Sequence, residues 1–446
     1  MLRSQTSRLR RSLGDFVRSK KEDAPLFAVL FALLVVGVLL RLHRLDDPKV
    51  LKWDEVHYVE TARAYLAHQY AYNDHPPLSK LIIAGFMAVI GDTSVGWRLP
   101  SLLFGLGNFA IMAWLTWTVF RSKRAAWIAA AFVAADGFFI AYSRTALLDG
   151  MIVAFSLLSI TILLVGRRWW HVLLAGLFVG CATSFKLNGL AFVGTAMVIC
   201  LASRALRRFT PLLLLTGAVV FYAQAAFTLW LVGRPFSPSA VIAENVAMVT
   251  HHLSYTVVHP MSSHWYTWFL PTRPIPLRRD VDIDGSIRTL VTLGNPLLWW
   301  ASTLAVIVAA VVVIRTGPRR IWALLKADGT PPGPRADDAP TARADRSFLE
   351  DRAGALLWVL AAWAAPIVFW IPSLRDSYIY HFLPSYSFGL VLLAGLTDRM
   401  YRRFRLHTLL AVVLVAEVTL FYAPIWSELP LTQSALHARL FFPFWR

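Results

Sequence analysis

Residues 294–314 read GNPLLWWASTLAVIVAAVVVI and contain no charged side chain. A helix of about 20 apolar residues can cross the hydrocarbon layer of a bilayer, which is about 30 Å thick. Similar apolar runs lie at 26–42, 99–120, 125–142, 147–165, 169–184, 187–203, 210–232, 354–372, 378–396 and 407–424. The pattern predicts an all-α polytopic membrane protein with about 11 transmembrane helices.

The composition also favours a membrane protein. Hydrophobic residues make up 57% of the 446-residue chain and charged residues only 16%, whereas a soluble domain is about a quarter charged. A net charge of +18 would suggest nucleic-acid binding in a soluble protein, but membrane proteins retain Lys and Arg in cytoplasmic loops. We therefore expect no nucleic-acid partner. Cys181 and Cys200 lie inside apolar runs, so they indicate neither a disulfide framework nor a metal site.

Clusters of basic residues indicate the orientation of the spans. They lie at 8–11, 121–124, 167–168, 204–208, 315–320 and 399–405. With a cytoplasmic N-terminus, all of them fall on the cytoplasmic side, as the positive-inside rule requires. We predict a multi-pass plasma-membrane protein in this orientation. The run 26–42 is interpreted as a retained span and not as a cleaved signal peptide, because no small-residue cleavage site of the usual form accompanies it.

This orientation divides the chain into spans and loops. The predicted regions are a cytoplasmic N-terminus (1–25), helices 1 to 7 (26–232) including an outside loop (43–98), a second outside loop (233–293), helix 8 (294–314), a cytoplasmic linker (315–353), helices 9 to 11 (354–424) and an outside tail (425–446). The first outside loop is expected to contain helical stretches at 56–70 and 78–90, the second of them interfacial or re-entrant. The Pro-, Gly- and Asp-rich linker is expected to be disordered.

An acidic pair, Asp54 and Glu55, follows the first span at the start of a predicted helix. Acids at that position often only cap the helix and complement its dipole. A carboxylate at the membrane surface, beside a lipid headgroup, is also suited to act as a general base. Both interpretations remain open from this pair alone.

Further polar side chains fall on the same membrane face. They are His75, Lys80 and Arg98 in and after the first loop, Arg144 and Asp149 between two spans, Lys186 and Asn188 at the next outside turn, and Tyr380 and His381 at the last one. Each has a structural alternative, such as a proline-led helix start, a snorkelling arginine or an interhelical ion pair. Their common location favours a functional site in which Lys80, Arg98 and Arg144 balance the charge of a phosphate.

The second outside loop is rich in aromatic and histidine residues. The candidate site residues there are His259, Ser263, Trp265, Trp268 and Arg273. An aromatic belt at the membrane interface is the alternative. Neither His264 nor His381 shows ligand spacing with a second His or Cys, so no metal site is predicted.

Several of these segments form a set. They are 54–57 (DEVH), 75–80 (HPPLSK), 143–149 (SRTALLD), 185–189 (FKLNG), 259–275 (HPMSSHWYTWFLPTRPI), 294–300 (GNPLLWW) and 380–384 (YHFLP). In residues and in order, the set resembles the protein O-mannosyltransferase family, within the GT-C class of multispanning glycosyltransferases. The resemblance extends over most of 50–390.

The resemblance implies a fold, a donor and an acceptor. The donor would be polyprenyl- or dolichyl-phosphate mannose, and the acceptor a Ser or Thr hydroxyl of an exported protein. Transfer would invert the anomeric carbon and need no metal or other cofactor. The acid at Asp54 would be the base, while Glu55, Arg98 and the residues near His75 and Lys80 would belong to the donor site. The candidates of the second outside loop would handle the acceptor.

The chain also departs from the family. The loop 233–293 is too short for the folded soluble domain that eukaryotic members carry there, as in bacterial members. Leu187 stands where an aromatic residue is expected, and 278–280 (RRD) differs from the family's sequence after its Arg-Pro-Ile element. These departures concern the acceptor more than the donor.

Two other functions remain open at this stage. The same fold could glycosylate a lipid or a cell-envelope polysaccharide instead of a protein. A transporter would also need many spans and membrane-embedded charges, but transporters often contain inverted repeats, and none is visible here. The sequence indicates no oligomeric state.

Overall fold

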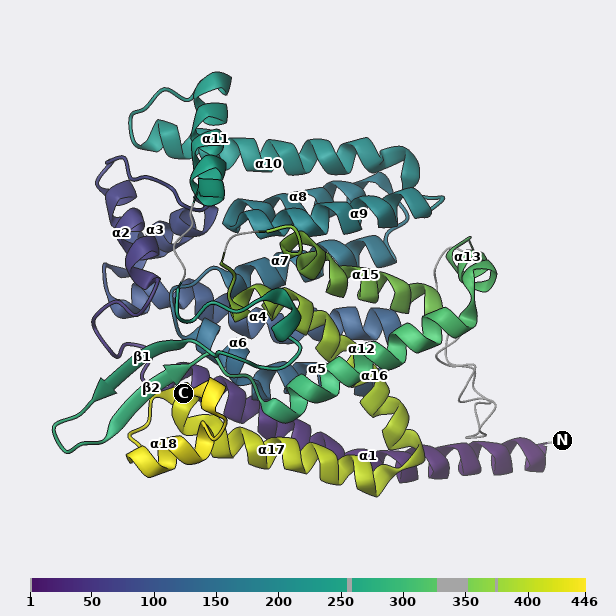
Figure 1. The fold of residues 1–446 in the computed structure, drawn as a ribbon. Coiled ribbons are helices and arrows are strands. Elements are labelled where there is room, and N and C mark those ends of the chain that lie inside the picture. Colours follow the sequence, from purple (N-terminus) through teal and green to yellow (C-terminus); the bar gives the residue numbers. More distant parts are fainter. Residues whose placement is uncertain (1, 255–258, 327–351, 374–375) are drawn as a thin grey trace.

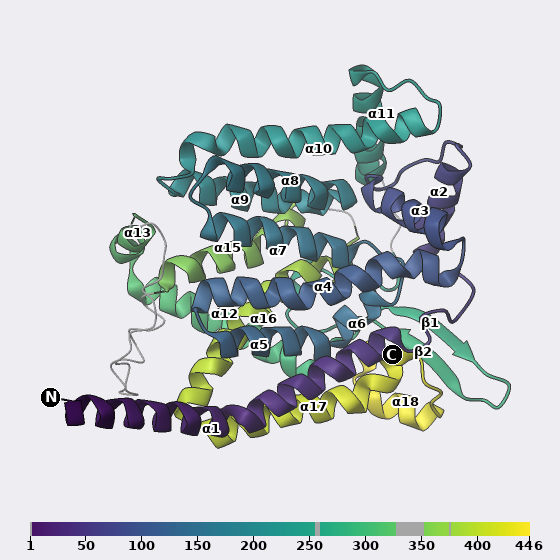
Figure 2. The same ribbon diagram turned by 180° about the vertical axis from the view of Figure 1, so that it is seen from behind.

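The computed structural model describes residues 2–254, 259–326, 352–373 and 376–446. Long helices run side by side and form a bundle with two distinct ends (Figures 1 and 2). The bundle helices are α1 (Leu2–Leu42), α4 (Ser94–Phe120), α5 (Lys123–Ala135), α6 (Gly137–Ser143), α7 (Asp149–Val165), α8 (Trp169–Phe185), α9 (Leu190–Ala202), α10 (Thr210–Leu231), α12 (Pro296–Thr316), α15 (Ala353–Trp370), α16 (Leu383–Arg403) and α17 (Arg405–Ser427). The mostly helical class is as predicted.

Every predicted span corresponds to one of these helices or, for 125–142, to the pair α5 and α6. Within the described residues, seven helices are long and apolar enough to cross a membrane, or eight if the pair counts as one span. The helices α7, α8 and α9 are apolar but shorter, so the count of about 11 stays a prediction. The centre of the bundle is α16, whose most apolar stretch is 89% buried, against 28% for α10 at the periphery.

The break between α5 and α6 has a clear local cause. The two helices meet at 65°, and Asp136 between them caps α6 by accepting hydrogen bonds from the Phe138 and Phe139 N–H groups. Its other oxygen accepts from the Asn295 N–H and the Tyr386 hydroxyl, both at 2.8 Å. A buried acid persists when its oxygens are bonded in this way. The bend carries the chain toward the end of the bundle where 144–149 lies.

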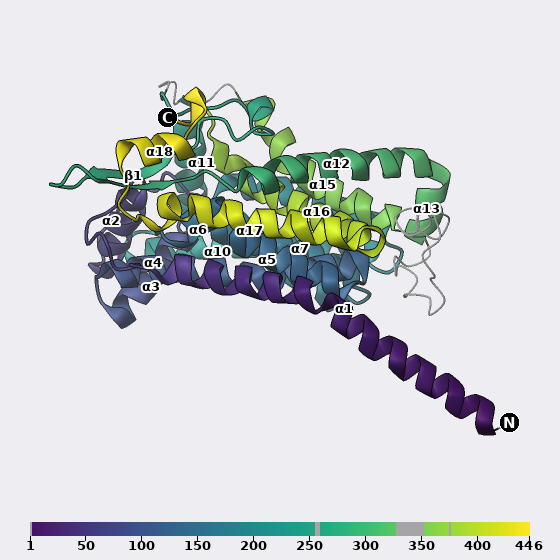
Figure 3. The same ribbon diagram turned by 90° about the horizontal axis from the view of Figure 1, so that it is seen from below.

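Several short elements gather at one end of the bundle. They are α2 (Glu55–Leu66), α3 (Leu78–Ile90), α11 (Pro238–Ser254), β1 (Pro276–Val281), β2 (Ile287–Val291) and α18 (Gln433–Arg439). The N-terminus and α13 (Pro318–Lys326) lie at the opposite end, and the N-terminal part of α1 extends away from the bundle (Figure 3). We call the first group of elements the loop layer.

The loop layer adds features that the sequence interpretation lacked. Strands β1 and β2 form an antiparallel hairpin within the second loop, and Ile287 of β2 bridges to Leu431 of the tail. The helix expected at 56–70 ends at Leu66, and His68 then adopts a left-handed φ of 54°. The linker expected to be disordered contains α13, while its residues 327–351 lie outside the described part.

Candidate active site

Asp54 is the N-cap residue of α2, but its side chain makes no capping hydrogen bond. The capping interpretation of this acid is therefore not realised. The residue is partly exposed. Burial raises the pKa of its carboxyl above the ordinary value, although the charges of Lys186 and His57 act in the opposite direction. A carboxylate that is not used as a helix cap and has a raised pKa is suited to accept a proton.

Its neighbour Glu55 is in the opposite situation. Its side chain is fully buried and forms a two-point ion pair with Arg98, at 2.8 and 3.0 Å. The backbone N–H groups of Lys52 and Ala146 each donate to it at 2.8 Å. Because all these bonds converge on one carboxylate, Glu55 fixes the fold of the loop and has little capacity left for a substrate.

Two of the three cations expected to bind a phosphate, Arg98 and Lys80, are used in the same way. Arg98 also donates to the backbone carbonyls of Leu45, Pro48 and Val50. Its planar fork of N–H groups is thereby occupied. The prediction that Arg98 contacts a donor phosphate is not supported by this geometry.

Lys80 is fully buried, and its ammonium donates to Asn73 Oδ1, Asp74 Oδ1 and the His75 carbonyl at 3.1, 2.9 and 3.3 Å. Three acceptors match the three N–H groups of an ammonium. Lys80 therefore stabilises the turn that carries His75, and its predicted phosphate contact stays a prediction. Although burial acts against it, the charges of His75 and Lys80 lower the pKa of Asp74 well below its usual range.

Arg144 follows α6 in the chain, and its side chain lies against the C-terminal end of α1. It donates to the carbonyls of Leu40 and His43 and is 3.6 Å from the Glu428 carboxylate. The last carbonyls of a helix lack partners within the helix, which explains why an arginine is held there. Its buried Nε has no hydrogen-bond partner among the described residues, so the expected phosphate contact of Arg144 stays a prediction.

The remaining donor-site candidates do come together. A cavity of about 520 Å³ is lined by five of them, His75, Lys186, Asn188, Tyr380 and His381. They come from the first loop, from the end of α8 and the 3₁₀ turn Leu187–Gly189, and from the 3₁₀ turn Ile379–Phe382. The sequence interpretation missed the wall formed by Val249, His252 and Leu253 of α11, since nothing local distinguishes these residues from other residues of an amphipathic helix.

Lys186 is the cation of this cavity. Its ammonium is 3.6 Å from Asp149 Oδ1 and 4.2 Å from the centre of the Tyr380 ring. Both contacts are longer than an ordinary charge-assisted hydrogen bond. The arrangement therefore holds a positive charge in a buried site without using its N–H groups in short bonds.

Polar atoms around Lys186 are also left over. His75 Nδ1 and Asn188 Oδ1 are buried, and the described residues offer them no hydrogen-bond partner. Leaving such an atom unsatisfied costs about 1–3 kcal/mol, so a cluster of them indicates a site for a polar ligand. Burial also lowers the pKa of His75 well below its ordinary value, and its ring stacks on that of His252 with the centres 5.1 Å apart.

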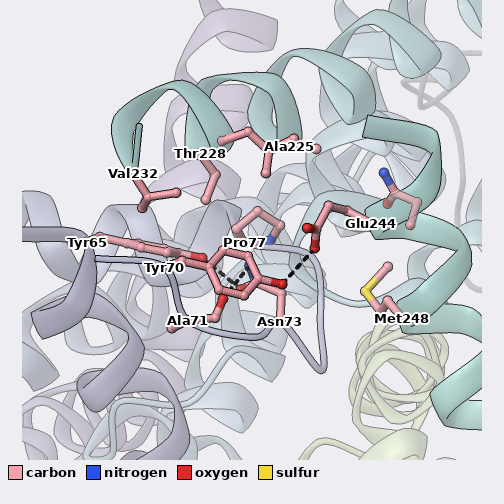
Figure 4. A pocket seen from close by; sticks show the side chains of 12 residues that line it. Tyr65, Tyr70, Ala71, Asn73, Pro77, Ala225, Thr228, Val232, Glu244 and Met248 are labelled. Carbon is pink, nitrogen blue, oxygen red and sulfur yellow. Dashed lines mark hydrogen bonds between the residues drawn. The ribbon is translucent and has the colours of Figure 1, made fainter. Parts of the chain in front are cut away.

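A second, smaller cavity lies between the first loop, α10 and α11 (Figure 4). Its volume is about 30 Å³, which is room for about one water molecule. The Tyr70 hydroxyl donates to Glu244 across it at 3.1 Å, and Tyr65 donates to Asn73 at 2.7 Å. The small volume and these bonds indicate that this region attaches α11 to the loop and does not hold a sugar.

The acceptor candidates of the second loop are divided. Trp268 is fully buried and donates to Ser263 Oγ at 3.0 Å, so both belong to the packed base of the loop layer. Arg273 donates to the Ser262 carbonyl, and Trp265 is partly buried. The His259 ring lies beside the turn that precedes α2, with its centre 5.8 Å from that of the Trp53 ring.

Metal binding has no candidate group among the described residues. Nowhere in that part of the chain do three His, Cys, Asp or Glu side chains lie together in a way that could hold an ion. The cavity histidines contact aromatic rings instead, as in His381 against Trp370 with ring centres 3.9 Å apart.

The bundle with a loop layer at one end is a fold of multispanning glycosyltransferases. It resembles a chain of the Saccharomyces cerevisiae Pmt1-Pmt2 complex bound to the sugar donor, with a TM-score of 0.73, 14% identity, and coverage of 95% of this chain and 92% of that one. It also resembles ArnT from Cupriavidus metallidurans bound to undecaprenyl phosphate, with a TM-score of 0.54, 19% identity, and coverage of 89% and 64%. These likenesses establish the GT-C fold.

Sequence comparison defines the family. The model for dolichyl-phosphate-mannose-protein mannosyltransferase matches residues 31–97 and 87–236, and that for the C-terminal four-transmembrane region of protein-O-mannosyltransferase matches 239–445. The chain therefore belongs to the protein O-mannosyltransferase family. A polyprenol-phosphate-mannose–protein mannosyltransferase of Mycolicibacterium smegmatis is 24% identical over 94% of this chain and 92% of its own length. Its counterpart in Corynebacterium glutamicum is 24% identical over 83% and 81%.

Proposed function

We propose that this protein transfers mannose from a polyprenyl-phosphate mannose to hydroxyl groups of exported proteins. The cavity around Lys186 carries this proposal, because it combines a buried cation with unsatisfied polar atoms within electrostatic reach of Asp54. The names of the bacterial relatives, which match over most of both chains, support the sugar and the class of acceptor.

In the proposed reaction the acceptor oxygen attacks the anomeric carbon as the bond to the phosphate oxygen breaks. Asp54 takes the proton of the attacking hydroxyl, and polyprenyl phosphate leaves with the electron pair of the broken bond. Lys186 stabilises the negative charge that accumulates on this leaving group, as a preorganised cation does. His75 and Asn188 supply further polar contacts, and attack from the opposite side inverts the anomeric carbon.

The positions of the basic connections indicate the side of the membrane on which the site lies. The basic connections 121–124, 167–168 and 204–208 lie at the bundle end opposite the loop layer (Figure 1). Applied to this arrangement, the positive-inside rule favours a cytoplasmic N-terminus and an active site at the outer face of the membrane. We further propose that the reaction needs no metal, and a chelator should leave the rate unchanged.

A transfer assay tests the function. Purified enzyme in detergent is given polyprenyl-phosphate mannose labelled in the sugar and a Ser/Thr-rich peptide, with Asp54→Asn in parallel. The matched control is Asp46→Asn, an exposed acid in the same loop. We expect labelled peptide with the wild type and the control but not with Asp54→Asn. Donor hydrolysis without labelled peptide would instead point to a lipid or polysaccharide acceptor, and an untouched donor would refute the proposal.

A further inference from the structure

Glu428 is a buried acid immediately after α17, in the tail that the sequence analysis left without a role. Its side chain is 3% exposed and lies 2.6 Å from the Lys52 ammonium. Its second oxygen lies 2.5 Å from the Arg278 guanidinium, and Arg144 is 3.6 Å away. One carboxylate thus joins the tail to the first loop, to the hairpin strand β1 and to the turn before α7.

The backbone at Glu428 is unusual. The residue occupies the left-handed cap position of α17, with φ of 60°. Gly or Asn is normally found there, because a larger side chain is strained in that conformation. A glutamate is compatible with this position because its carboxylate gains the three cations. The ion pairs therefore offset the backbone strain at Glu428.

The partner Lys52 leads directly to the proposed base. The Lys52 N–H donates to Glu55 Oε2 at 2.8 Å, and Trp53 between them has φ of 40°. A bulky residue stays in this conformation only when the surrounding structure holds it there. Glu428 holds the Lys52 side of this turn, and the pair of Glu55 with Arg98 holds the other side.

We infer that Glu428 is a positioning residue: by fixing Lys52 it sets the turn at Trp53 and directs the Asp54 carboxylate toward the acceptor hydroxyl. This inference rests on the proposed role of Asp54 as base. Glu428 touches no substrate in this scheme and acts only through Lys52 and the backbone that follows it.

The charges around Glu428 support the inference that it acts by holding Lys52. Burial lowers the pKa of Lys52 to about 8, against the opposing effect of Glu428. Burial alone would raise the pKa of Glu428, but the charges of Lys52 and Arg144 and the hydrogen bonds of Lys52 and Arg278 lower it. Glutamine at 428 would keep the shape of the side chain and remove its charge. The Lys52 ammonium would then lose the electrostatic attraction that holds it in position.

The test compares Glu428→Gln, Lys52→Met and the double variant in the full-length protein. We expect each single variant to lower kcat about 10- to 100-fold, the effect of a small misplacement of a reacting group, while the KM for donor changes less than about threefold. If Glu428 acts through Lys52, the double variant should be no slower than the slower single variant. Glu428→Asp should recover part of the rate.

Glu60→Gln is the matched control, because it breaks an exposed ion pair on α2, to Arg63, by the same substitution. Three results would overturn the inference: a Glu428→Gln enzyme within twofold of wild-type kcat, losses that multiply in the double variant, or a loss explained entirely by less folded protein. Failure of wild-type enzyme to transfer the sugar would instead refute the proposed function, so the two failures are distinguishable.

Discussion

Two neighbouring regions at the loop-layer end of the bundle contain the same kinds of polar side chain, but they differ in whether these side chains are paired within the protein. The first is the cavity around Lys186, where His75 Nδ1 and Asn188 Oδ1 are buried and have no hydrogen-bond partner in the described part of the chain. The second, which we call the ion-pair cluster, consists of Lys52, Glu55, Arg98, Arg144, Arg278 and Glu428. In the cluster, opposite charges face one another at short distance, and Arg98 has used its N–H groups within the protein.

The boundary between the two regions runs between Asp54 and Glu55, which are adjacent in the chain. Asp54 makes no capping hydrogen bond and has a raised pKa, whereas Glu55 is fully buried and receives bonds from Arg98 and two backbone N–H groups. An acid that accepts a proton from a substrate needs carboxylate oxygens that are not all hydrogen-bonded within the protein. An acid that stabilises the fold needs oxygens that are all bonded. The comparison shows that charge type alone does not separate ligand-binding residues from structural ones.

The largest expected effect is on the proposed base. Asp54→Asn should lower kcat by about 10²–10⁴-fold, the usual contribution of a positioned general base. Its melting temperature in detergent should stay close to that of the wild type, because the side chain makes no capping bond. Single-turnover rates and thermal unfolding measure the two quantities. Near-normal turnover in the folded variant would remove Asp54 from this role.

Glu55→Gln should lower stability more than turnover, the opposite of what is expected for Asp54→Asn. Breaking a fully buried ion pair from one side costs about 3–5 kcal/mol of stability, so the melting temperature should fall sharply. Activity per folded molecule should be less affected than in Asp54→Asn. The exposed pair partner Glu60 offers the control, Glu60→Gln, whose melting temperature should hardly change. If Glu55→Gln melts like the control, the ion-pair cluster does not stabilise the fold.

Lysines 186 and 80 provide the next contrast. Lys186→Met should lower kcat/KM for donor by about 10- to 100-fold, as expected for losing a charge-assisted contact of about 1.5–3 kcal/mol. Lys80→Met should instead lower stability, because the Lys80 ammonium is bonded only within its own loop. Donor titrations and melting curves separate the two effects, with exposed Lys49→Met as control. Equal kcat/KM values for the two variants would contradict the assignment.

The smallest expected effect is on pH dependence. Asp54 must be ionised to accept a proton, and burial raises its pKa, so kcat/KM should fall on the acid side at a higher pH than an ordinary aspartate would give. The Lys186 charge lowers this pKa, so Lys186→Met should move the acid limb to still higher pH. Profiles of kcat/KM against pH for both proteins check the direction. A shift toward lower pH would be inconsistent with this electrostatic coupling.

The membrane fold was largely predictable, because apolar runs and basic clusters act locally. The helix at 78–90 and the helical runs of the bundle agree with their apolar patterns. The hairpin at 276–291 was missed, since its short strands carry mixed polar residues and pair only with each other and with the tail. The break at Asp136 was also missed, because the partners Asn295 and Tyr386 come from distant helices.

The sequence by itself determined the class of protein, the acidic pair at 54–55 and five of the residues that line the cavity. It did so because hydrophobic periodicity and short motifs need no knowledge of distant contacts. Only the tertiary structure decided which charges are available. Arg98 and Lys80 are predicted as phosphate ligands from the sequence, but the folded chain bonds their N–H groups within the protein, and Glu428 lies far along the chain from Lys52. A buried charge is defined by the groups that face it, and those groups are brought together only by the folded chain.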